Sequence, residues 1–529
     1  MRVNIGRKIY SRRFYGRRGL LFVTLLILTV LFFSCFISTF KGVSLFVLGA
    51  PDKSVNNETD LRTAINNAPT NHQFTIALNN DIAITEFTLE IPANKDIVLT
   101  SNKASGYYKL TGTAHGTSPF IVGDLSVSTI TVNSAGILTL DGIEVTHACG
   151  YPGYAVTVGE KGQFILHNGL ISSNIGGVYN GGVFLMYDGM ISGNSAINGG
   201  GVYNRGVFKM FGGEISDNSA WQNGGGVYNE VTFEMSGGKI SGNTANHGGG
   251  IYNWGGATGI DYQFTSSATK EFIGYTGQSV GGFILLNGVI TCNTAWRGGG
   301  VCNFGVFNMG DGSISDNTAT VSGGGVYNGD SIAMGNFEMS GGKISANTAV
   351  KGGGVYNFFY SIVSLSGNGV ISGNTAELGG GMCMDSDFNM IGGEISGNNA
   401  DNGGGVYIGN GVFKLSAGKI LKNIAVYDGG GIWVDNERLG LLFVSNGVVF
   451  SDNRASAAFN RDPVHDAVYG SQIGNKVTWT SSFAQGYNNY DISYYSNYKA
   501  THMGGYITFI VPIVLVVGVV ISVSFLVCI

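Results

Sequence analysis

The chain has 529 residues, of which 87 are glycine and only 7 are proline, and this combination excludes collagen. Hydrophobic residues make up 44% of the chain, which excludes a disordered protein. Seven of the 29 basic residues lie at positions 1–18, which leaves 22 basic against 34 acidic residues in the body. Because nucleic acids need a basic surface, we expect no nucleic-acid partner.

The first predicted element is an apolar segment behind the basic cluster. Residues 20–40 contain no charged side chain, and at about 1.5 Å per residue they are long enough to cross a hydrocarbon core as a helix. Basic residues favour the cytoplasmic side, so residues 1–18 are predicted to form a cytoplasmic segment. We interpret residues 19–48 as a signal-anchor or a cleaved signal peptide, and we expect the segment after them to be exported.

Residues 51–142 are predicted to form N-terminal capping coils of a stacked structure. The pattern Asp-Leu-Arg-Thr-Ala-Ile at 60–65 predicts a short helix. Strands are expected near 74–78, 87–91 and 96–100. A cap is needed physically, because the end of a stack otherwise exposes strand edges and core side chains.

Residues 143–460 carry a repeat, interrupted by an irregular insertion near 254–282. Its clearest copies read Gly-Gly-Gly-Val-Tyr-Asn at 199–204 and 224–229, and one unit is typically 24–25 residues long. Within each unit, pairs such as Phe208 and Met210 flank a variable residue, which is the period of a half-buried strand. Three short strands per unit cannot bury an apolar face alone, so the units must stack. The predicted fold is all-β: a right-handed parallel β-helix, or β-solenoid, with terminal transmembrane helices.

The Val-Tyr-Asn strand predicts two kinds of interior residue. Its first position is always apolar, and its third position is asparagine in six copies and apolar in three others, so both should face inward. We therefore expect an internal ladder of asparagine amides, with Asn229 between Asn204 and Asn253. A second recurrent asparagine, in Ile-Ser-Gly-Asn-Thr-Ala and its variants, is expected at a corner, because asparagine tolerates left-handed turns and caps backbone groups.

The middle position of the same strand is predicted to face outward and to form an aromatic column. Such rings can stack on sugars or other flat ligands, and repetition would provide avidity. The alternative is that the rings only stabilise neighbouring coils. The candidate ligand-binding residues are Tyr203, Tyr228, Tyr252, Tyr327, Tyr356, Tyr407 and Trp433.

The repeat ends near residue 460. Residues 461–503 are interpreted as the remnant of a cap with a stalk behind it. Residues 506–529 are predicted to form a C-terminal transmembrane segment, either retained or exchanged for another anchor. These features predict a protein of the cell membrane whose β-helix is extracellular, with the membrane itself as a partner.

The paired Gly-Gly-Gly-Val-Tyr-Asn and Ile-x-x-Asn motifs resemble the Gly-Gly-Ala-Ile and Phe-x-x-Asn repeats of the chlamydial-type polymorphic membrane proteins. They are equally similar to adhesin-like β-helix proteins, and the resemblance covers roughly residues 136–455. It implies a pectin-lyase-like fold and an adhesin-like protein that binds an extracellular glycan, or the surface of a host or neighbouring cell. The sequence departs from that family by isoleucine in place of its phenylalanine, and by Gly-Gly-Gly-Val in place of Gly-Gly-Ala-Ile.

Enzymatic activity is the main rival, because many parallel β-helices are polysaccharide lyases or hydrolases. Glycosidases need two placed carboxylates, and the available pairs are Asp385 with Asp387 and Asp428 with Asp435. We nominate no catalytic residue and expect no cofactor. The six cysteines show no metal-ligand spacing and indicate neither a disulfide framework nor a metal site. A third hypothesis is a structural cell-envelope protein without a specific ligand.

Overall fold

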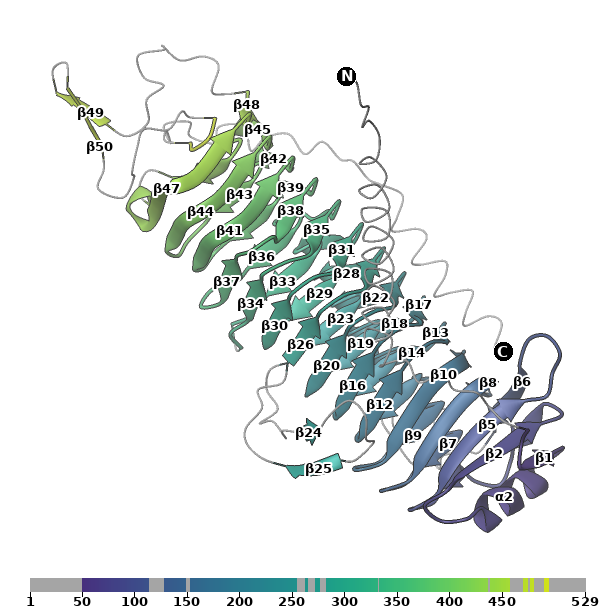
Figure 1. Cartoon of the computed structure of the whole chain (residues 1–529). Coiled ribbons are helices and arrows are strands. Elements are labelled where there is room, and N and C mark those ends of the chain that lie inside the picture. The colour runs from purple at the N-terminus through teal and green to yellow at the C-terminus, as the bar shows by residue number, and fades with distance from the viewer. Residues whose placement is uncertain are drawn as a thin grey trace, which may run out of the picture. The chain divides into compact units, whose positions relative to one another are not determined.

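The computed structural model describes residues 50–113, 128–148, 153–254 and 282–456, apart from 332, 436 and 437. It also describes the short segments 262–264, 272–275, 470–473, 476–479 and 490–493. Two compact units are present. Of the first unit, the structure describes an antiparallel hairpin of β24 (Tyr262–Phe264) and β25 (Phe272–Tyr275), which lies within the predicted insertion. The second is a parallel β-helix whose coils stack along one axis (Figure 1).

One coil shows how the repeat folds. It consists of β15 (Val202–Asn204), β16 (Val207–Met210), β17 (Glu214–Ser216) and β18 (Ser219–Asn223). These pair in parallel with β19 (Val227–Asn229), β20 (Thr232–Met235), β21 (Lys239–Ser241) and β22 (Thr244–His247) of the next coil. This coil therefore has four strands where three were predicted, because the segments on either side of the second asparagine form separate strands, whereas the coil of β40 (Met382–Met384), β41 (Phe388–Ser396) and β42 (Asn399–Asn402) has three.

The first sheet, the tyrosine sheet, contains the Val-Tyr-Asn strands. Its 13 strands succeed one another in chain order, and each pairs in parallel with the next. Besides β15 and β19 they are β4 (Leu89–Ile91), β7 (Ile130–Val132), β9 (Val156–Val158), β11 (Val178–Asn180), β23 (Ile251–Asn253), β29 (Val301–Asn303), β33 (Val326–Asn328), β36 (Val355–Asn357), β40 (Met382–Met384), β43 (Val406–Ile408) and β46 (Ile432–Val434).

The second sheet, the phenylalanine sheet, has 24 strands and contains the Phe-x-Met and Ile-Ser segments. In several coils these two segments are joined into one long strand, as in β8, β10, β41, β44 and β47. Besides β16, β17, β20 and β21 the strands are β1 (Lys53–Val55), β2 (Gln73–Leu78), β3 (Ile82–Ile84), β5 (Asp96–Ser101), β6 (Tyr108–Gly112), β8 (Ile137–His147), β10 (Gln163–Ser172), β12 (Val183–Met186), β13 (Met190–Ser192), β26 (Gly282–Leu285), β27 (Val289–Thr291), β30 (Val306–Met309), β31 (Ser313–Ser315), β34 (Asn336–Met339), β35 (Lys343–Ser345), β37 (Ile362–Leu365), β38 (Val370–Ser372), β41 (Phe388–Ser396), β44 (Phe413–Leu421) and β47 (Leu442–Ser451).

The third sheet, the alanine sheet, is named for the buried alanine in its strands, such as Ala220 and Ala295. It has a five-stranded and a four-stranded section, connected through single bridges at Thr348. Besides β18 and β22 the strands are β14 (Ser195–Asn198), β28 (Thr294–Arg297), β32 (Thr318–Ser322), β39 (Thr375–Leu378), β42 (Asn399–Asn402), β45 (Ile424–Asp428) and β48 (Arg454–Ala455).

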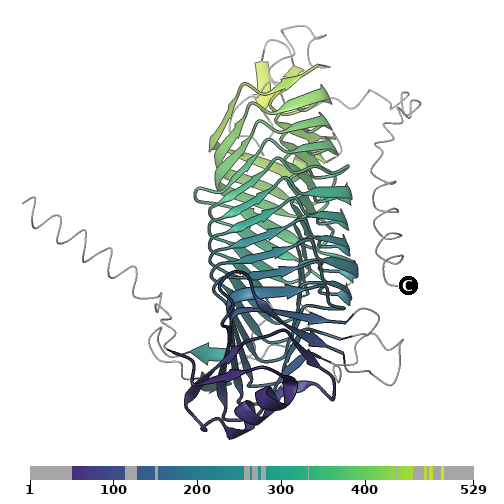
Figure 2. The ribbon, with the colours of Figure 1, turned by 90° about the vertical axis from the view of Figure 1, so that its right-hand side faces the viewer.

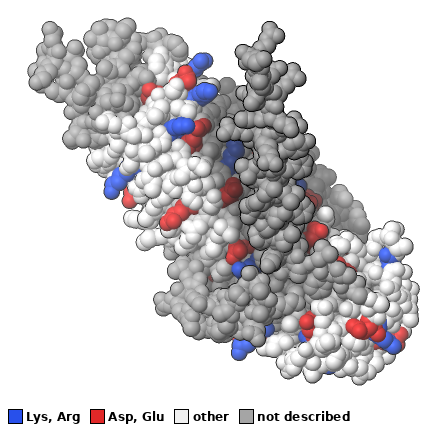
Figure 3. All heavy atoms as spheres, viewed as in Figure 1, with Lys and Arg blue, Asp and Glu red and all other residues white. Residues whose placement is uncertain are grey.

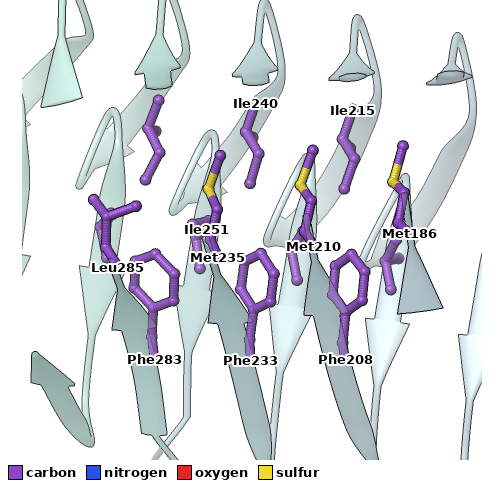
Figure 4. Close-up of a cluster of buried hydrophobic side chains, with 14 of the residues drawn as sticks. Met186, Phe208, Met210, Ile215, Phe233, Met235, Ile240, Ile251, Phe283 and Leu285 are labelled. Carbon is purple, nitrogen blue, oxygen red and sulfur yellow. The ribbon is translucent and has the colours of Figure 1, made fainter. Parts of the chain in front are cut away.

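Much of the core is made of identical side chains stacked from coil to coil. Phe233 lies between Phe208 and Phe283, with ring centroids 4.5 and 5.1 Å away, and all three rings are buried. Met210 and Met235 form a second column beside them (Figure 4). The alternation of Phe and Met about an outward residue is thus confirmed, and stacking at the strand spacing accounts for the strict repetition.

The asparagine ladder of the tyrosine sheet is confirmed. Each side chain except the last, Asn357, donates from Nδ2 to Oδ1 of the asparagine in the next coil, over 2.7 or 2.8 Å. Asn357 donates instead to the carbonyl oxygens of Ser361 and Asp387. None of these side chains is exposed to solvent, so the amides satisfy one another inside the helix. The members are Asn180, Asn204, Asn229, Asn253, Asn303, Asn328 and Asn357.

The second asparagine forms another buried ladder. Asn218, for example, donates from Nδ2 to Asn243 Oδ1 over 3.0 Å, and its backbone N–H donates to the same oxygen. The predicted capping of backbone groups is confirmed, but the expected left-handed conformation lies one residue earlier, as at Asp217 with φ 56°. Members of the ladder are Asn174, Asn194, Asn218, Asn243, Asn293, Asn317, Asn347, Asn374, Asn398, Asn423 and Asn453.

The glycine triplet makes the corner between the alanine and tyrosine sheets. Gly224 has φ +67°, the left-handed region that favours glycine. A Cβ on Gly225 would lie 2.5 Å from the carbonyl oxygen of Thr244 in the next coil. A Cβ on Gly226 would lie 2.6 Å from the carbonyl oxygen of Gly250, also in the next coil. The triplet thus excludes side chains for two reasons: backbone conformation at Gly224, and contact with the backbone of the next coil at Gly225 and Gly226.

Described segments pack against both ends of the stack. At the N-terminal end, α2 (Glu58–Asn67) buries Leu61, Ala64 and Ile65 in the core, which confirms the predicted capping helix (Figure 2). At the other end, Ile492 bridges Ile432, and Asp491 Oδ1 accepts a 2.8 Å hydrogen bond from Asn453, the last amide of the second ladder. The 3-10 helix η2 (Leu439–Leu441) and the hairpin of β49 (Gly470–Ile473) and β50 (Lys476–Trp479) complete the described elements.

The predicted membrane segments at 19–48 and 506–529, like residues 1–18, lie outside the described residues. In the part of the chain that the structure describes, no helix combines the length and apolar character needed to span a bilayer.

Candidate functional site

The predicted aromatic column lies outside the main core, but its centre is not exposed. Tyr327 is 1% exposed, and Tyr252 and Tyr356 are each 6% exposed. They form a second buried cluster with Cys302 and Cys383, packed against Phe304 and Phe358 from the turns after the strands. The expectation of a solvent-facing column is therefore wrong at these three tyrosines, because bulky turn residues cover them.

The remaining column residues, Tyr203, Tyr228, Tyr407 and Trp433, are half-buried. Ring centroids of Tyr203 and Tyr228 are 4.7 Å apart, and those of Tyr407 and Trp433 are 4.3 Å apart with nearly parallel planes. Rings stacked in this way cover each other's faces and leave mainly their edges to solvent. Coil-to-coil stabilisation therefore accounts for the column, whose part in binding stays a prediction.

Polar partners hold the hydroxyl group of Tyr203, which also stacks on Tyr179 of the preceding coil. The Tyr203 hydroxyl donates to Glu230 Oε1 over 2.5 Å, and Glu230 Oε2 accepts from Arg205 Nε over 2.9 Å. Burial and the Glu230 carboxylate raise the pKa of Tyr203 well above its usual range. Burial raises the pKa of Tyr228 to about 12, with a further contribution from Glu230. Both phenols thus stay protonated at physiological pH and can act only as neutral hydrogen-bonding groups.

The four carboxylates considered for catalysis have structural hydrogen bonds. The Tyr356 hydroxyl donates to Asp385, and Asp387 accepts from the backbone N–H of Val412 over 2.9 Å. Asp428 accepts from the N–H of Gly429, and Asp435 pairs with Arg438. In the described residues no group of three or more His, Cys, Asp or Glu side chains could hold a metal ion. Cys302 and Cys383 are buried free thiols, and burial raises the pKa of each.

Among the residues whose burial is described, the most exposed tryptophans lie on the neighbouring alanine sheet, and the sequence interpretation missed them. Trp221 in β18 is 72% exposed and Trp296 in β28 is 46% exposed. Each comes directly after a buried alanine, Ala220 or Ala295, so the period-two alternation of a strand could have identified them. The equivalent position of β22, between these two strands, is the exposed Asn246.

Two basic side chains border Trp296. The Arg297 guanidinium lies 4.5 Å from the ring centroid of Trp296 and 5.4 Å from that of Tyr327, so it connects the alanine and tyrosine sheets across the glycine corner. The His247 ring lies 5.7 Å from that of Trp296, and its Nδ1 is 3.2 Å from Asn223 Oδ1. Burial and the Arg297 charge lower the pKa of His247, and Asp330 opposes this effect. His247 is thus neutral at pH 7.

Charges elsewhere on the surface are mixed. Ion pairs link neighbouring coils, for example Lys209 with Glu234 at 3.1 Å and Lys239 with Glu214 at 3.0 Å. Figure 3 shows acidic and basic side chains interspersed on one face of the molecule. A surface of this kind provides hydrogen bonds and aromatic contacts rather than a field of one sign.

Comparisons of the chain with protein-family models, curated proteins and solved structures found no match.

Proposed function

We propose that this protein is an adhesin-like protein of the cell surface, anchored in the membrane, that binds an extracellular glycan or a partner surface through its β-helix. The observation that carries the proposal is the exposure of Trp221 and Trp296 on a sheet whose strands are fixed by pairing on both sides. Large aromatic side chains exposed on a rigid, repetitive scaffold provide contact area at a low cost in conformational entropy.

The proposed location rests on the sequence. The basic cluster at 1–18 and the apolar segment after it favour export of the β-helix, and the apolar segment at 506–529 favours a second attachment to the membrane. Right-handed winding is part of the proposal, because connections between parallel strands are almost always right-handed. The resemblance of the repeats to polymorphic membrane proteins and adhesin-like β-helix proteins supports the same function.

The location is tested by adding a protease to intact cells that express the full chain. We expect the β-helix to be shortened or removed, and a fragment containing residues 1–18 to persist until the cells are lysed. Digestion of the β-helix only after lysis would contradict the proposed topology.

Binding is tested by adhesion of cells that display the full chain to surfaces coated with glycans or with extracts of neighbouring cells. The wild type should increase adhesion over cells without the protein. The column is tested in the same assay with Tyr407→Ser and Trp433→Ser together, since these rings are half-buried and can be changed with little loss of core. Release of reducing or unsaturated sugar ends by the purified protein would contradict a non-enzymatic function and favour the lyase or hydrolase alternative.

A further inference from the structure

One surface patch lies on the outer face of the alanine sheet between β14 and β32. It presents Trp221 and Trp296 with the exposed Asn246 between them. The strands of this five-stranded section contain neither aspartate nor glutamate. We call Trp221, Asn246 and Trp296, with Arg297 and His247 at their edge, the tryptophan platform.

The register of the strands fixes the spacing of the platform. Ala245 pairs with Ala295 and His247 with Arg297, so Asn246 lies opposite Trp296. Ser219 pairs with Thr244 and Asn223 with His247, so both Trp221 and Gln222 lie opposite Asn246 at a bulge. Since adjacent strands are about 4.8 Å apart, the two tryptophans are separated by roughly 10 Å along the axis of the β-helix.

Trp221 and Trp296 are more exposed than the tyrosines of the column. In the described residues no aromatic ring lies against Trp221, whose neighbours in the adjacent strands are Ile197 and Asn246. Arg297 lies over the Trp296 ring, but Trp296 is still 46% exposed. The column tyrosines, in contrast, stack on each other from coil to coil.

The chemistry of the platform matches a sugar chain. The C–H face of a sugar ring is apolar and packs on an aromatic face, while its hydroxyl groups need hydrogen-bonding partners at the edges. The Asn246 amide donates and accepts, and the Arg297 guanidinium carries five N–H donors. These strands carry no carboxylate, and the one permanent cation of the platform, Arg297, already lies over two rings. The platform therefore favours uncharged hydroxyl groups over a strongly charged ligand.

We propose that the tryptophan platform is a binding site for a neutral glycan chain that lies along the axis of the β-helix, with one sugar ring on Trp221 and another on Trp296. This inference rests on the proposed adhesin function and assigns it a site and a ligand class. Asn246 hydrogen-bonds the sugar between the two rings, and Arg297 bonds hydroxyl groups at the edge. The tyrosine column contributes to the rigidity of the β-helix that carries the platform.

The test uses the full chain in detergent micelles and an array of neutral and acidic glycans, with titration of the glycans that bind. We expect neutral glycans of several sugars to bind, and Trp221→Ser or Trp296→Ser to weaken the binding by about tenfold or more each. Asn246→Ala should weaken it less. Tyr427→Ser is the matched control, because Tyr427 is 58% exposed in β45, in the other section of the alanine sheet, and should leave binding unchanged.

Several results would overturn this inference. Unchanged glycan binding in Trp221→Ser, with loss in the Tyr407→Ser and Trp433→Ser double variant, would move the site to the column and leave the adhesin function intact. Binding of acidic glycans only, or adhesion to a protease-sensitive partner without glycan binding, would contradict the ligand class alone. Absence of any binding or adhesion by the wild type would contradict both proposals. Circular dichroism of each variant shows that the fold is retained, which is expected because both tryptophans are exposed.

Discussion

The replacement Asn229→Asp tests the asparagine ladder with the change of a single atom type. Asn229 Nδ2 donates to Asn253 Oδ1 over 2.7 Å and to the carbonyl oxygen of Gly282 over 3.1 Å. Its Oδ1 accepts from Asn204 Nδ2 over 2.7 Å. Aspartate keeps the accepting oxygen, but it places a second oxygen against two acceptors, in a position with no solvent exposure.

The cost can be derived from these contacts. A buried carboxylate facing two acceptors is so unfavourable that the side chain will take up a proton. Holding a proton at pH 7 on a group whose ordinary pKa is about 3.9 costs about 4 kcal/mol. The protonated group can donate one of the two hydrogen bonds that the amide donated, and the loss of the other bond adds about 1 kcal/mol. We therefore expect a destabilisation of about 5 kcal/mol at pH 7, which falls to about 1 kcal/mol near pH 4.

The assay is urea unfolding at pH 7 and pH 4, combined with amide hydrogen exchange, because a stack of coils can open locally without global unfolding. The loss of protection should be centred on β19 and its neighbours β15 and β23. The control is Asn389→Asp in β41, since Asn389 is only half-buried and lies between Ser364 and Lys414. Equal stability of Asn229→Asp and the wild type at both pH values would refute the ladder as a stabilising feature.

Three further predictions concern the corner, the core and the platform edge. Gly225→Ala should disrupt stacking and lower the free energy of unfolding in urea by several kcal/mol, because its Cβ would lie 2.5 Å from a carbonyl oxygen. The control is Gly193→Ala, where the Cβ would meet open space but the backbone has a φ of +65°, and this change should cost about 1 kcal/mol. Phe233→Ala should lower the free energy of unfolding by about 3–5 kcal/mol, since it leaves a cavity inside the ring stack, and a loss below 1 kcal/mol would mean that the stack closes up. Burial and the Arg297 charge lower the pKa of His247 in the fold, so His247 takes up a proton more readily in the unfolded chain. Its stabilising effect is therefore present above about pH 6.5 and is lost as the pH falls. The urea midpoint should therefore fall less between pH 7 and pH 5 in His247→Gln than in the wild type, and an equal fall would contradict this assignment.

The sequence by itself determined the repeat and its inward face. Phe208 and Met210 alternate with an outward residue in a pattern that only a strand produces, and the replacement of Asn204-type residues by Met384, Ile408 and Val434 in later copies revealed that the third position is buried. A position that accepts either an amide or an apolar side chain must face the core, where the amide needs a partner of its own kind. Local chemistry was also sufficient for the helix at the N-terminal end.

Only the tertiary structure decided which outer residues are exposed. Tyr252, Tyr327 and Tyr356 occupy the same strand position as Tyr203, but Phe304 and Phe358 cover the region around them from turns of different coils. In the sequence, Trp221 and Trp296 appear only as departures from the repeat. In the structure they lie on the same sheet with one strand between them, because the register aligns β18, β22 and β28. Alternation along one strand tells which side a residue faces. Whether that side meets solvent depends on segments far away in the chain, and these are brought together only by stacking.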